Sequence, residues 1–308
     1  MQDPETLVLF QCHVLNATTL AALGHLHDTV GQRYRIEVLL DRGNENIELA
    51  ELPVPVFGFE SRNFANWGFA TYGKSMLPGH CHFPLLRYAQ KIDFRFKHIW
   101  LIEYDVRYSG DWNVFFDNFE NTDADLLCCH LKSHEHEPGW YLWETYKAPP
   151  DQQSDQTMFR AFLVIARYSR AAIESVVEFH HRGGRGHQEV SIPMAIYRAG
   201  LSIQDFNWQP PESKQDTERL STVYSTHSDL DGRIEFFGTV CWRPAFSKVP
   251  TEYGKLFHPV KTIAAGEFNI NGDTFVARVR CLIRLTKAFL IRVIKGIDRQ
   301  PLREQIIQ

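Results

Sequence analysis

The stretch His98-Ile99-Trp100-Leu101-Ile102-Glu103-Tyr104-Asp105-Val106 decides the fold of this chain. The apolar run Ile99 to Ile102 predicts a short strand that is buried on both faces. Glu103 and Asp105 follow at i, i+2 spacing, and a buried carboxylate without a positive partner is strongly destabilised. The two acids must therefore reach water at the edge of a sheet or be neutralised. A divalent cation held against a nucleotide diphosphate is one partner that would neutralise them.

The first 41 residues predict a neighbouring part of the same sheet. Strands at 6–13 and 33–40 flank a helix at 18–30, and this order indicates a right-handed βαβ unit with parallel strands. A ligand of such a sheet is expected at the carboxyl ends of its strands. The other expected elements are helices at 84–91, 112–119, 169–181 and 189–198, strands at 98–106, 124–130, 162–166 and 201–206, an irregular connection at 45–80, and a loop-rich part at 207–275.

Composition restricts the class of protein. The 308 residues, 44% of them hydrophobic, are enough for one large α/β domain or two small ones, and a net charge of −4 gives no case for nucleic-acid binding. The six cysteines show no paired spacing, which favours free thiols in a reducing compartment. No signal peptide and no membrane-spanning run is visible, so a cytoplasmic enzyme is expected.

The C-terminal segment 276–308 has a different pattern. Basic residues recur from Arg278 to Arg303 between apolar ones, and Asp298 is the only acid in that stretch. This pattern predicts a basic amphipathic helix that lies on the inner face of an anionic membrane as a peripheral contact. The alternative is a terminal helix that docks on its own domain or on a second subunit.

The motif from Trp100 to Arg107, followed by Ser109-Gly110-Asp111-Trp112, resembles the GT-A class of nucleotide-sugar glycosyltransferases, and within it a little-characterised family. The order of elements is similar over residues 6–260, but only 98–116 is specific. The resemblance implies a GT-A-like, Rossmann-like α/β fold with a mainly parallel sheet flanked by helices. It places one domain at 1–275, with a nucleotide-binding half at 6–105 and an acceptor half at 106–275.

The resemblance also implies a metal site for Mn²⁺ or Mg²⁺ that bridges the donor diphosphate. Asp105 would be a direct ligand, and Glu103 would act through water or the donor ribose, although the class usually has Asp in the position of Glu103. His258 would be a late metal ligand, since imidazole suits Mn²⁺ beside oxygen ligands, and Lys261 would steady the diphosphate. The alternative for His258 is a hydrogen-bonded histidine before a proline turn.

Glu189 resembles the acid that begins the helix under the acceptor site in inverting enzymes of this class. A base there would remove the proton of the acceptor hydroxyl, and a helix N-terminus favours an ionised carboxylate. The alternative is an ordinary first-turn glutamate, and Asp155 is a second candidate for the same role.

Donor contacts are expected at the ends of the first two strands and in the irregular connection. Cys12 and His13, then Asp41 and Arg42, would meet the base and ribose of a nucleoside-diphosphate sugar, with a UDP-sugar favoured, and Lys74 would meet a phosphate. The alternative for each is an ordinary turn residue.

Other chemistry-bearing residues gather between 130 and 143. His130, His134 and His136 match no zinc template and predict a solvated loop near the acceptor pocket. Trp140, Tyr141 and Trp143 would stack on sugar faces or pack in a loop. The pair His180-His181 is interpreted as surface.

These features together predict an inverting, metal-dependent glycosyltransferase with a glycan or lipid-linked acceptor, in cell-surface polysaccharide or lipopolysaccharide synthesis. Two alternatives remain: a non-catalytic binding module of the same fold, and a metal-dependent hydrolase built on Asp105 and the histidines at 130–136.

Overall fold

A computed structural model describes residues 6–43, 52–92, 96–152, 157–206, 224, 239–241, 245–249, 253–261 and 306–307. The chain divides into two compact units. Unit 1 comprises Met1–Tyr104, Asn121–Asp205 and Ile306–Gln308, and unit 2 comprises Asp105–Glu120 and Phe206–Gln305. The boundary runs through the acidic motif itself, between Tyr104 and Asp105. The domain limits expected from the sequence stay a prediction.

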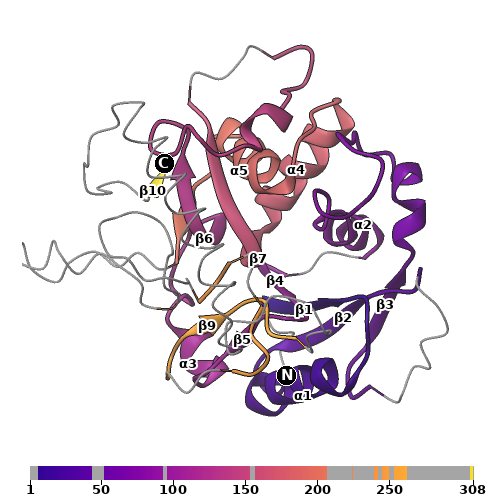
Figure 1. The fold of residues 1–308 in the computed structure, drawn as a ribbon, viewed down its shortest axis with the longest axis vertical. Helices are drawn as coiled ribbons and strands as arrows, with labels where there is room; N and C mark the ends of the chain where they lie inside the picture. The colour runs from indigo at the N-terminus through magenta and orange to yellow at the C-terminus, as the bar shows by residue number, and fades with distance from the viewer. Residues whose placement is uncertain are drawn as a thin grey trace, which may run out of the picture. The chain divides into compact units, whose positions relative to one another are not determined.

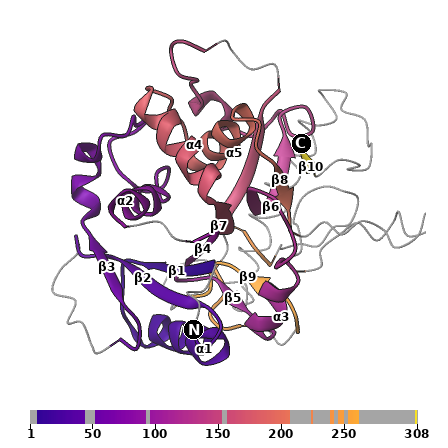
Figure 2. The ribbon, with the colours of Figure 1, turned by 180° about the vertical axis from the view of Figure 1, so that it is seen from behind.

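Unit 1 is built on an eight-stranded sheet with the order β10-β8-β6-β7-β4-β1-β2-β3 (Figure 2). The strands are β1 (Thr6–Cys12), β2 (Arg35–Asp41), β3 (Val56–Phe59), β4 (His98–Glu103), β6 (Leu126–Ser133), β7 (Phe159–Ser169), β8 (Ile203–Asp205) and β10 (Ile306–Ile307). Four neighbouring pairs are parallel and three are antiparallel. The predicted fold class, a mainly parallel sheet flanked by helices, is confirmed.

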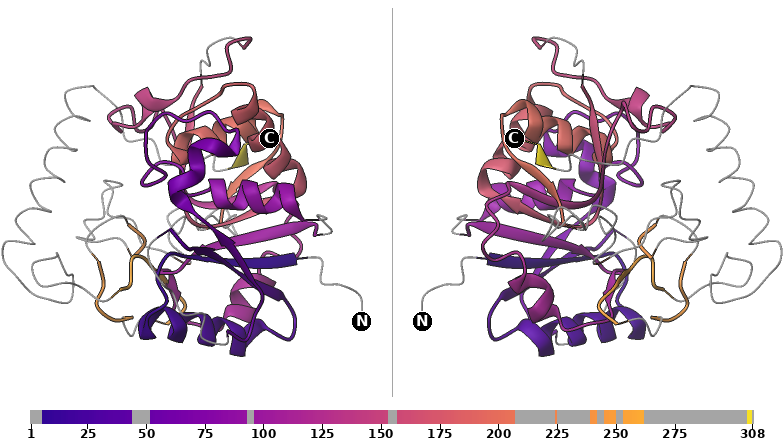
Figure 3. Two further views of the ribbon diagram at one scale, coloured as in Figure 1. Left: turned by 90° about the vertical axis from the view of Figure 1, so that its right-hand side faces the viewer. Right: turned by 90° about the vertical axis from the view of Figure 1, so that its left-hand side faces the viewer.

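Helices cover both faces of this sheet. Figures 1 and 3 show α1 (Ala17–Val30) on one face, and α2 (Phe83–Lys91), α4 (Arg170–His181) and α5 (Gln188–Arg198) on the other. The Asn16 side chain accepts a hydrogen bond from the Thr19 amide and so caps α1. The Ser169 side chain accepts one from the Ala172 amide and starts α4 directly after β7.

Strand β4 lies inside the sheet, as its apolar sequence predicts. It pairs in parallel with β1 and antiparallel with β7, and its residues from His98 to Ile102 are buried. The strand ends at Glu103, three residues before the expected end, and Tyr104 and Asp105 form a turn. Because β6 also runs antiparallel to β7, the carboxyl ends of β1, β4 and β6 lie at one edge of the sheet.

Two expectations about elements are corrected, and a third lies mostly outside the described residues. The connection at 45–80 contains a strand, β3, and a 3₁₀ helix, η1 (Ser61–Trp67), so it is not wholly irregular. Strand β7 has 11 residues where five were expected. The predicted C-terminal helix, which Gly296 and Pro301 are expected to end near Lys295, lies outside the described residues, and Ile306–Ile307 form a strand antiparallel to β8.

The described part of unit 2 contains a short helix, α3 (Trp112–Asp117), and a two-stranded sheet of β5 (Arg107–Tyr108) and β9 (Leu256–Phe257). Asp111 caps α3, because its side chain accepts a hydrogen bond from the Asn113 amide. The buried rings of Trp112, Phe115 and Phe116 pack against one another and form an aromatic core.

Two further findings concern membranes and thiols. Within the described ranges, no helix has the length and apolar character needed to cross a bilayer. The described cysteines are free, as expected: Cys12, Cys81, Cys128, Cys129 and Cys241.

Candidate metal and acceptor site

Asp105 is held in unit 2 by the segment that contains His258. Its backbone carbonyl accepts a hydrogen bond of 2.7 Å from the Val260 amide. The side chain is buried, with 4% of the residue exposed. The carboxylate therefore lies inside the unit and needs a compensating positive charge.

His258 is fixed by a short bridge to the segment 239–241. Its amide donates to the Thr239 carbonyl at 2.8 Å, and its carbonyl accepts from the Cys241 amide at 3.1 Å. The ring Nδ1 lies 2.7 Å from the Cys241 carbonyl oxygen. A carbonyl can only accept, so Nδ1 carries the hydrogen and Nε2 is left with a lone pair unless the ring is protonated.

That Nε2 lies 3.3 Å from Asp105 Oδ1. Two acceptors at this separation require a cation between them, either a proton on the ring or a metal ion. A metal-binding histidine commonly donates its other ring N–H to a backbone carbonyl, as His258 does here. The sequence predicted the residue pair, and the structure brings the two residues together.

The pKa of Asp105 reflects the same neighbours. Burial alone would raise it, but the charge and hydrogen bond of His258, followed by the charge of Lys261, lower it below its usual value. Lys261 Nζ lies 3.6 Å from Asp105 Oδ2. Lys261 thus places a second cationic side chain beside the Asp105 carboxylate.

Glu103 adds a third side chain, since one residue of continuous chain separates it from Asp105. Glu103, Asp105 and His258 each offer one ligand atom, and these atoms lie within 4.8 Å of one another. Two carboxylate oxygens and one imidazole nitrogen suit Mn²⁺, and the oxygens also suit Mg²⁺. The residues present therefore fit a divalent metal.

Glu189 lies in the first turn of α5, as predicted. The His187 side chain caps this helix and accepts a hydrogen bond of 3.3 Å from the Glu189 amide. The Glu189 side chain is half-buried. Asp155, the second candidate for a base, lies outside the described residues.

Cys81 connects Glu189 to the acidic motif inside unit 1. Burial raises the pKa of the Cys81 thiol well above its usual value, and the carboxylates of Glu103 and Glu189 raise it further. Gln11 lies opposite Glu103 in the β1–β4 register, and its Nε2 donates to the Cys81 carbonyl at 2.8 Å. The His82 amide donates to Gln188 Oε1 at 3.1 Å. These contacts connect the end of β4 to the first turn of α5, which carries Glu189.

The residues predicted to contact the donor fall into two groups. Cys12 is buried, which raises the pKa of its thiol to about 12, and Asp41 Oδ1 accepts from the amides of Gly43 and Ser61, both at 2.9 Å. The Cys12 side chain thus lies in the core, and the Asp41 carboxylate is bound by backbone amides. His13, Arg42 and Lys74 are exposed, and the His13 ring lies edge-on to Tyr104, with 4.7 Å between ring centroids. The side chains of His13, Arg42 and Lys74 therefore lie outside the core, where they can reach a ligand.

The remaining histidines differ from the interpretation of the sequence. His130 lies in β6 and is buried, with a φ of 55°, so it is not part of a solvated loop. His134 and His136 are exposed in the following turn, as expected. Among the described residues, the one group with metal-ligand geometry is that of Glu103, Asp105 and His258.

His180 is buried rather than on the surface, and its Nε2 lies 3.0 Å from Nε2 of His82. The ring Nδ1 of His180 lies 3.0 Å from the Gly184 carbonyl oxygen. His180 therefore donates from Nδ1, and His82 donates to its Nε2. No local sequence pattern indicates this pair, because its members lie 98 positions apart in the chain.

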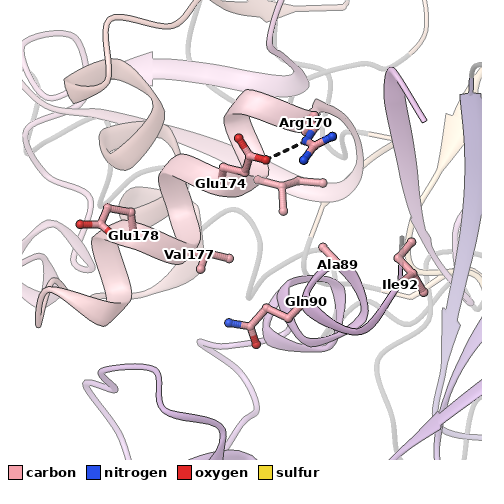
Figure 4. Close-up of a pocket in the computed structure, with 8 residues that line it drawn as sticks. Ala89, Gln90, Ile92, Arg170, Glu174, Val177 and Glu178 are labelled. Carbon is pink, nitrogen blue, oxygen red and sulfur yellow. Dashed lines mark hydrogen bonds and ion pairs between the residues drawn. The ribbon is translucent and has the colours of Figure 1, made fainter. Parts of the chain in front are cut away.

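Unit 1 also has a surface hollow of 360 Å³ between α2 and α4, lined by residues that include Gln90, Arg170 and Glu174 (Figure 4). Arg170 and Glu174 form an ion pair there at 2.7 Å. None of the predicted site residues lines this hollow, so it is separate from the candidate site.

Comparison with known proteins completes the description. No family model matches the sequence, and no curated protein matches it. Similar solved structures include CMP:2-keto-3-deoxy-manno-octonic acid synthetase complexed with CTP (9% identity, 66% of this chain and 89% of that one, TM-score 0.37). Others are galactosyltransferase LgtC with donor and acceptor sugar analogues (12%, 65% and 74%, 0.38) and mouse xyloside xylosyltransferase 1 (10%, 71% and 93%, 0.36).

These similar structures are a synthetase and two glycosyltransferases. The narrower family resemblance of residues 98–116 stays a prediction.

Proposed function

We propose that this chain is a metal-dependent glycosyltransferase that moves a sugar from a nucleoside-diphosphate sugar to a glycan or lipid-linked acceptor. The carrying observation is the fixed Nδ1–H of His258, which leaves its Nε2 facing the buried Asp105 carboxylate at 3.3 Å. Mn²⁺ or Mg²⁺ is the proposed ion, and a UDP-sugar is the favoured donor.

Each side chain has a proposed role. Asp105 and His258 would hold the metal, with Glu103 contributing through water or the donor ribose, and Lys261 would contact the diphosphate. When bound, a divalent metal stabilises negative charge on the departing diphosphate. His13, Arg42 and Lys74 are the exposed candidates for contacts with the rest of the donor.

Glu189 is the proposed base. Its half-buried carboxylate lies at the N-terminus of α5, where the helix dipole favours the ionised form that a base requires. Removal of the proton from the acceptor hydroxyl by Glu189, as that oxygen attacks the anomeric carbon, would give inversion. A retaining reaction would not need this base.

Donor binding is the first test. Purified protein is heated with UDP-, GDP-, CMP- or ADP-linked sugars, each with and without Mn²⁺. A ligand that binds only the folded state at about 100 times its Kd stabilises it by roughly 2.7 kcal/mol. We expect stabilisation with one nucleotide sugar in the presence of metal. Folded protein that responds to none of these combinations would contradict the proposal.

Glu189→Gln tests the base and separates a transferase from a binding module. We expect donor affinity to persist and transfer to fall by about 100-fold or more, the usual contribution of a general base. The control is Glu178→Gln, an α4 glutamate with 64% of its side chain exposed. Donor binding without turnover in the wild type would indicate a non-catalytic module instead.

The biological setting is proposed from the sequence. A lipid-linked acceptor in cell-surface polysaccharide or lipopolysaccharide synthesis would suit a cytoplasmic enzyme with a basic segment at 278–303. Binding of full-length protein to anionic vesicles, compared with a chain truncated after residue 275, measures that contact. Equal binding by the two proteins would contradict the peripheral-membrane proposal.

A further inference from the structure

A row of four rings includes His187, the N-cap residue of α5 in unit 1, and we call these rings the aromatic rim: Tyr72, Trp140, Tyr141 and His187. Neighbouring rings follow one another with centroid distances of 6.2 Å for Tyr72 and His187, 6.4 Å for His187 and Trp140, and 6.3 Å for Trp140 and Tyr141. His187 is buried, whereas 74% of Tyr141 is exposed. The aromatic rim therefore extends from the buried ring of His187 to the exposed ring of Tyr141.

The segment that carries Tyr141 is anchored on both sides. Trp143 is buried and donates from Nε1 to the Glu137 carbonyl at 2.8 Å. Thr145 Oγ1 accepts from the His187 amide at 2.9 Å, which ties the segment to the cap of α5. The guanidinium of Arg160 lies 5.0 Å from the Trp140 ring. An exposed ring on such a support loses little conformational entropy when it binds a ligand.

Tyr72 is positioned by a glycine. A Cβ at Gly79 would lie 2.3 Å from the Tyr72 ring, so the ring occupies the space that a side chain would fill. The Gly79 carbonyl accepts a hydrogen bond of 2.9 Å from the Gln188 amide in the first turn of α5. The Tyr72 amide lies 3.4 Å from His80 Nε2. These contacts hold Tyr72 beside the helix that carries Glu189.

The rim combines aromatic and acidic surface. Tyr72 contacts the ring of His187, and the His187 side chain accepts a hydrogen bond from the Glu189 amide. Burial raises the pKa of Tyr72, and Tyr141, Cys81 and Glu189 raise it further. The open ring face of Tyr141 can contact the C–H face of a sugar ring, while the Tyr72 hydroxyl and the Glu189 carboxylate can meet its hydroxyl groups.

We propose that the aromatic rim is the subsite for a saccharide acceptor, with one sugar ring stacked on Tyr141 and a hydroxyl directed toward Glu189. The inference rests on the proposed function for the role of Glu189, and it specifies that the acceptor group next to the reacting hydroxyl is a carbohydrate. Tyr141 and Tyr72 are then specificity-determining residues.

The test measures saccharide binding separately from donor chemistry. Saturation-transfer NMR on the full chain uses oligosaccharides ending in β-galactosyl, β-glucosyl, α-mannosyl or N-acetylglucosaminyl residues. The best binder is then titrated into Tyr141→Ala, Tyr141→Phe and Tyr253→Ala. Tyr253 is the matched control, a tyrosine with 76% exposure in unit 2. We expect about tenfold weaker binding for Tyr141→Ala, and wild-type binding for Tyr141→Phe and Tyr253→Ala.

Each outcome is decisive. Absence of saturation transfer to every oligosaccharide, or equal losses in Tyr141→Ala and Tyr253→Ala, would overturn the saccharide subsite. Binding that depends on Tyr141 in a protein that turns over no nucleotide sugar would support the rim and contradict the proposed function. Turnover of a donor without saccharide binding would contradict the rim alone.

Discussion

Two buried histidines, His258 in unit 2 and His180 in unit 1, make the same kind of contact at Nδ1 and opposite kinds of contact at Nε2. Each places Nδ1 against a backbone carbonyl, of Cys241 at 2.7 Å and of Gly184 at 3.0 Å. The Nε2 of His180 meets His82, which can donate a hydrogen, whereas that of His258 meets the carboxylate of Asp105, which cannot. The first pair can form its hydrogen bond with both rings neutral, whereas the second needs a cation.

The comparison shows that burial of a histidine does not indicate a metal site. Burial lowers the pKa of His180 to about 3 and that of His82 well below its usual value, so both rings stay neutral. In unit 2 the charge of His258 instead helps to lower the pKa of Asp105. The partner of Nε2 decides whether the site is structural or suited to an ion.

Asp105→Asn should have the largest effect. Loss of a direct ligand is expected to weaken Mn²⁺ binding by more than about 100-fold, since even indirect partners contribute 10- to 100-fold. Isothermal titration with Mn²⁺ measures this. The control is Asp41→Asn, a buried aspartate that accepts from backbone amides. Comparable affinities for the two variants would show that unit 2 does not hold the metal.

His82→Phe should damage the neutral pair and leave the metal site intact. His180 Nε2 would lose its donor, which destabilises the fold by about 1–3 kcal/mol. Urea unfolding measures the loss. His134→Phe, at an exposed position, is expected to change stability by less than about 0.5 kcal/mol. A weaker Mn²⁺ affinity in His82→Phe would contradict the separation of the two pairs.

Glu103→Gln should have a smaller effect than Asp105→Asn. If Glu103 acts through water or ribose, the expected loss of Mn²⁺ affinity is about tenfold. The same titration measures it. A loss as large as that of Asp105→Asn would make Glu103 a direct ligand.

The pH dependence of the free energy of unfolding should distinguish the His82–His180 pair from the Asp105–His258 pair. This effect is smaller than those of the substitutions above. A histidine whose pKa is lowered in the fold stabilises the protein above its unfolded pKa of about 6.5, and this contribution declines as pH falls toward the folded pKa. His82 and His180 each account for about 1.4 kcal/mol between pH 7.5 and 5.5. The lowered pKa of Asp105 acts at lower pH, where stability is lost as pH falls below about 3.9.

His82→Phe removes one of these titrating groups. The wild type should lose about 1.4 kcal/mol more than the variant between pH 7.5 and 5.5 in urea unfolding. Parallel losses in both proteins would show that His82 is not held neutral in the fold.

Local sequence patterns predicted the strands and helices that depend on interactions between residues close together in the chain. The apolar run of β4 requires burial on both faces, and the alternation of strand, helix and strand in the first 41 residues fixes a parallel pairing. Strand β3 was missed because its four residues, VFGF, follow a proline-rich stretch and contain Gly58. Short strands of this kind are defined by the neighbour they pair with.

The candidate site was predictable where side chains follow a strand end and unpredictable where distant segments meet. Glu103 and Asp105 follow from β4, and His258 from the family resemblance. Cys12 was expected to reach a ligand, but the inward face of β1 places it in the core. The contact of His82 with His180 depends on the packing of α2 against α4, which no local pattern encodes.

The central claim is that a divalent metal binds between Asp105 and His258 Nε2. Electron–nuclear double resonance of bound Mn²⁺, in protein labelled with ¹⁵N-histidine, tests it directly. The account predicts a ¹⁵N coupling from one histidine in the wild type, lost in His258→Gln and retained in His180→Gln. Mn²⁺ bound without any histidine coupling, or a coupling that survives in His258→Gln, would contradict it.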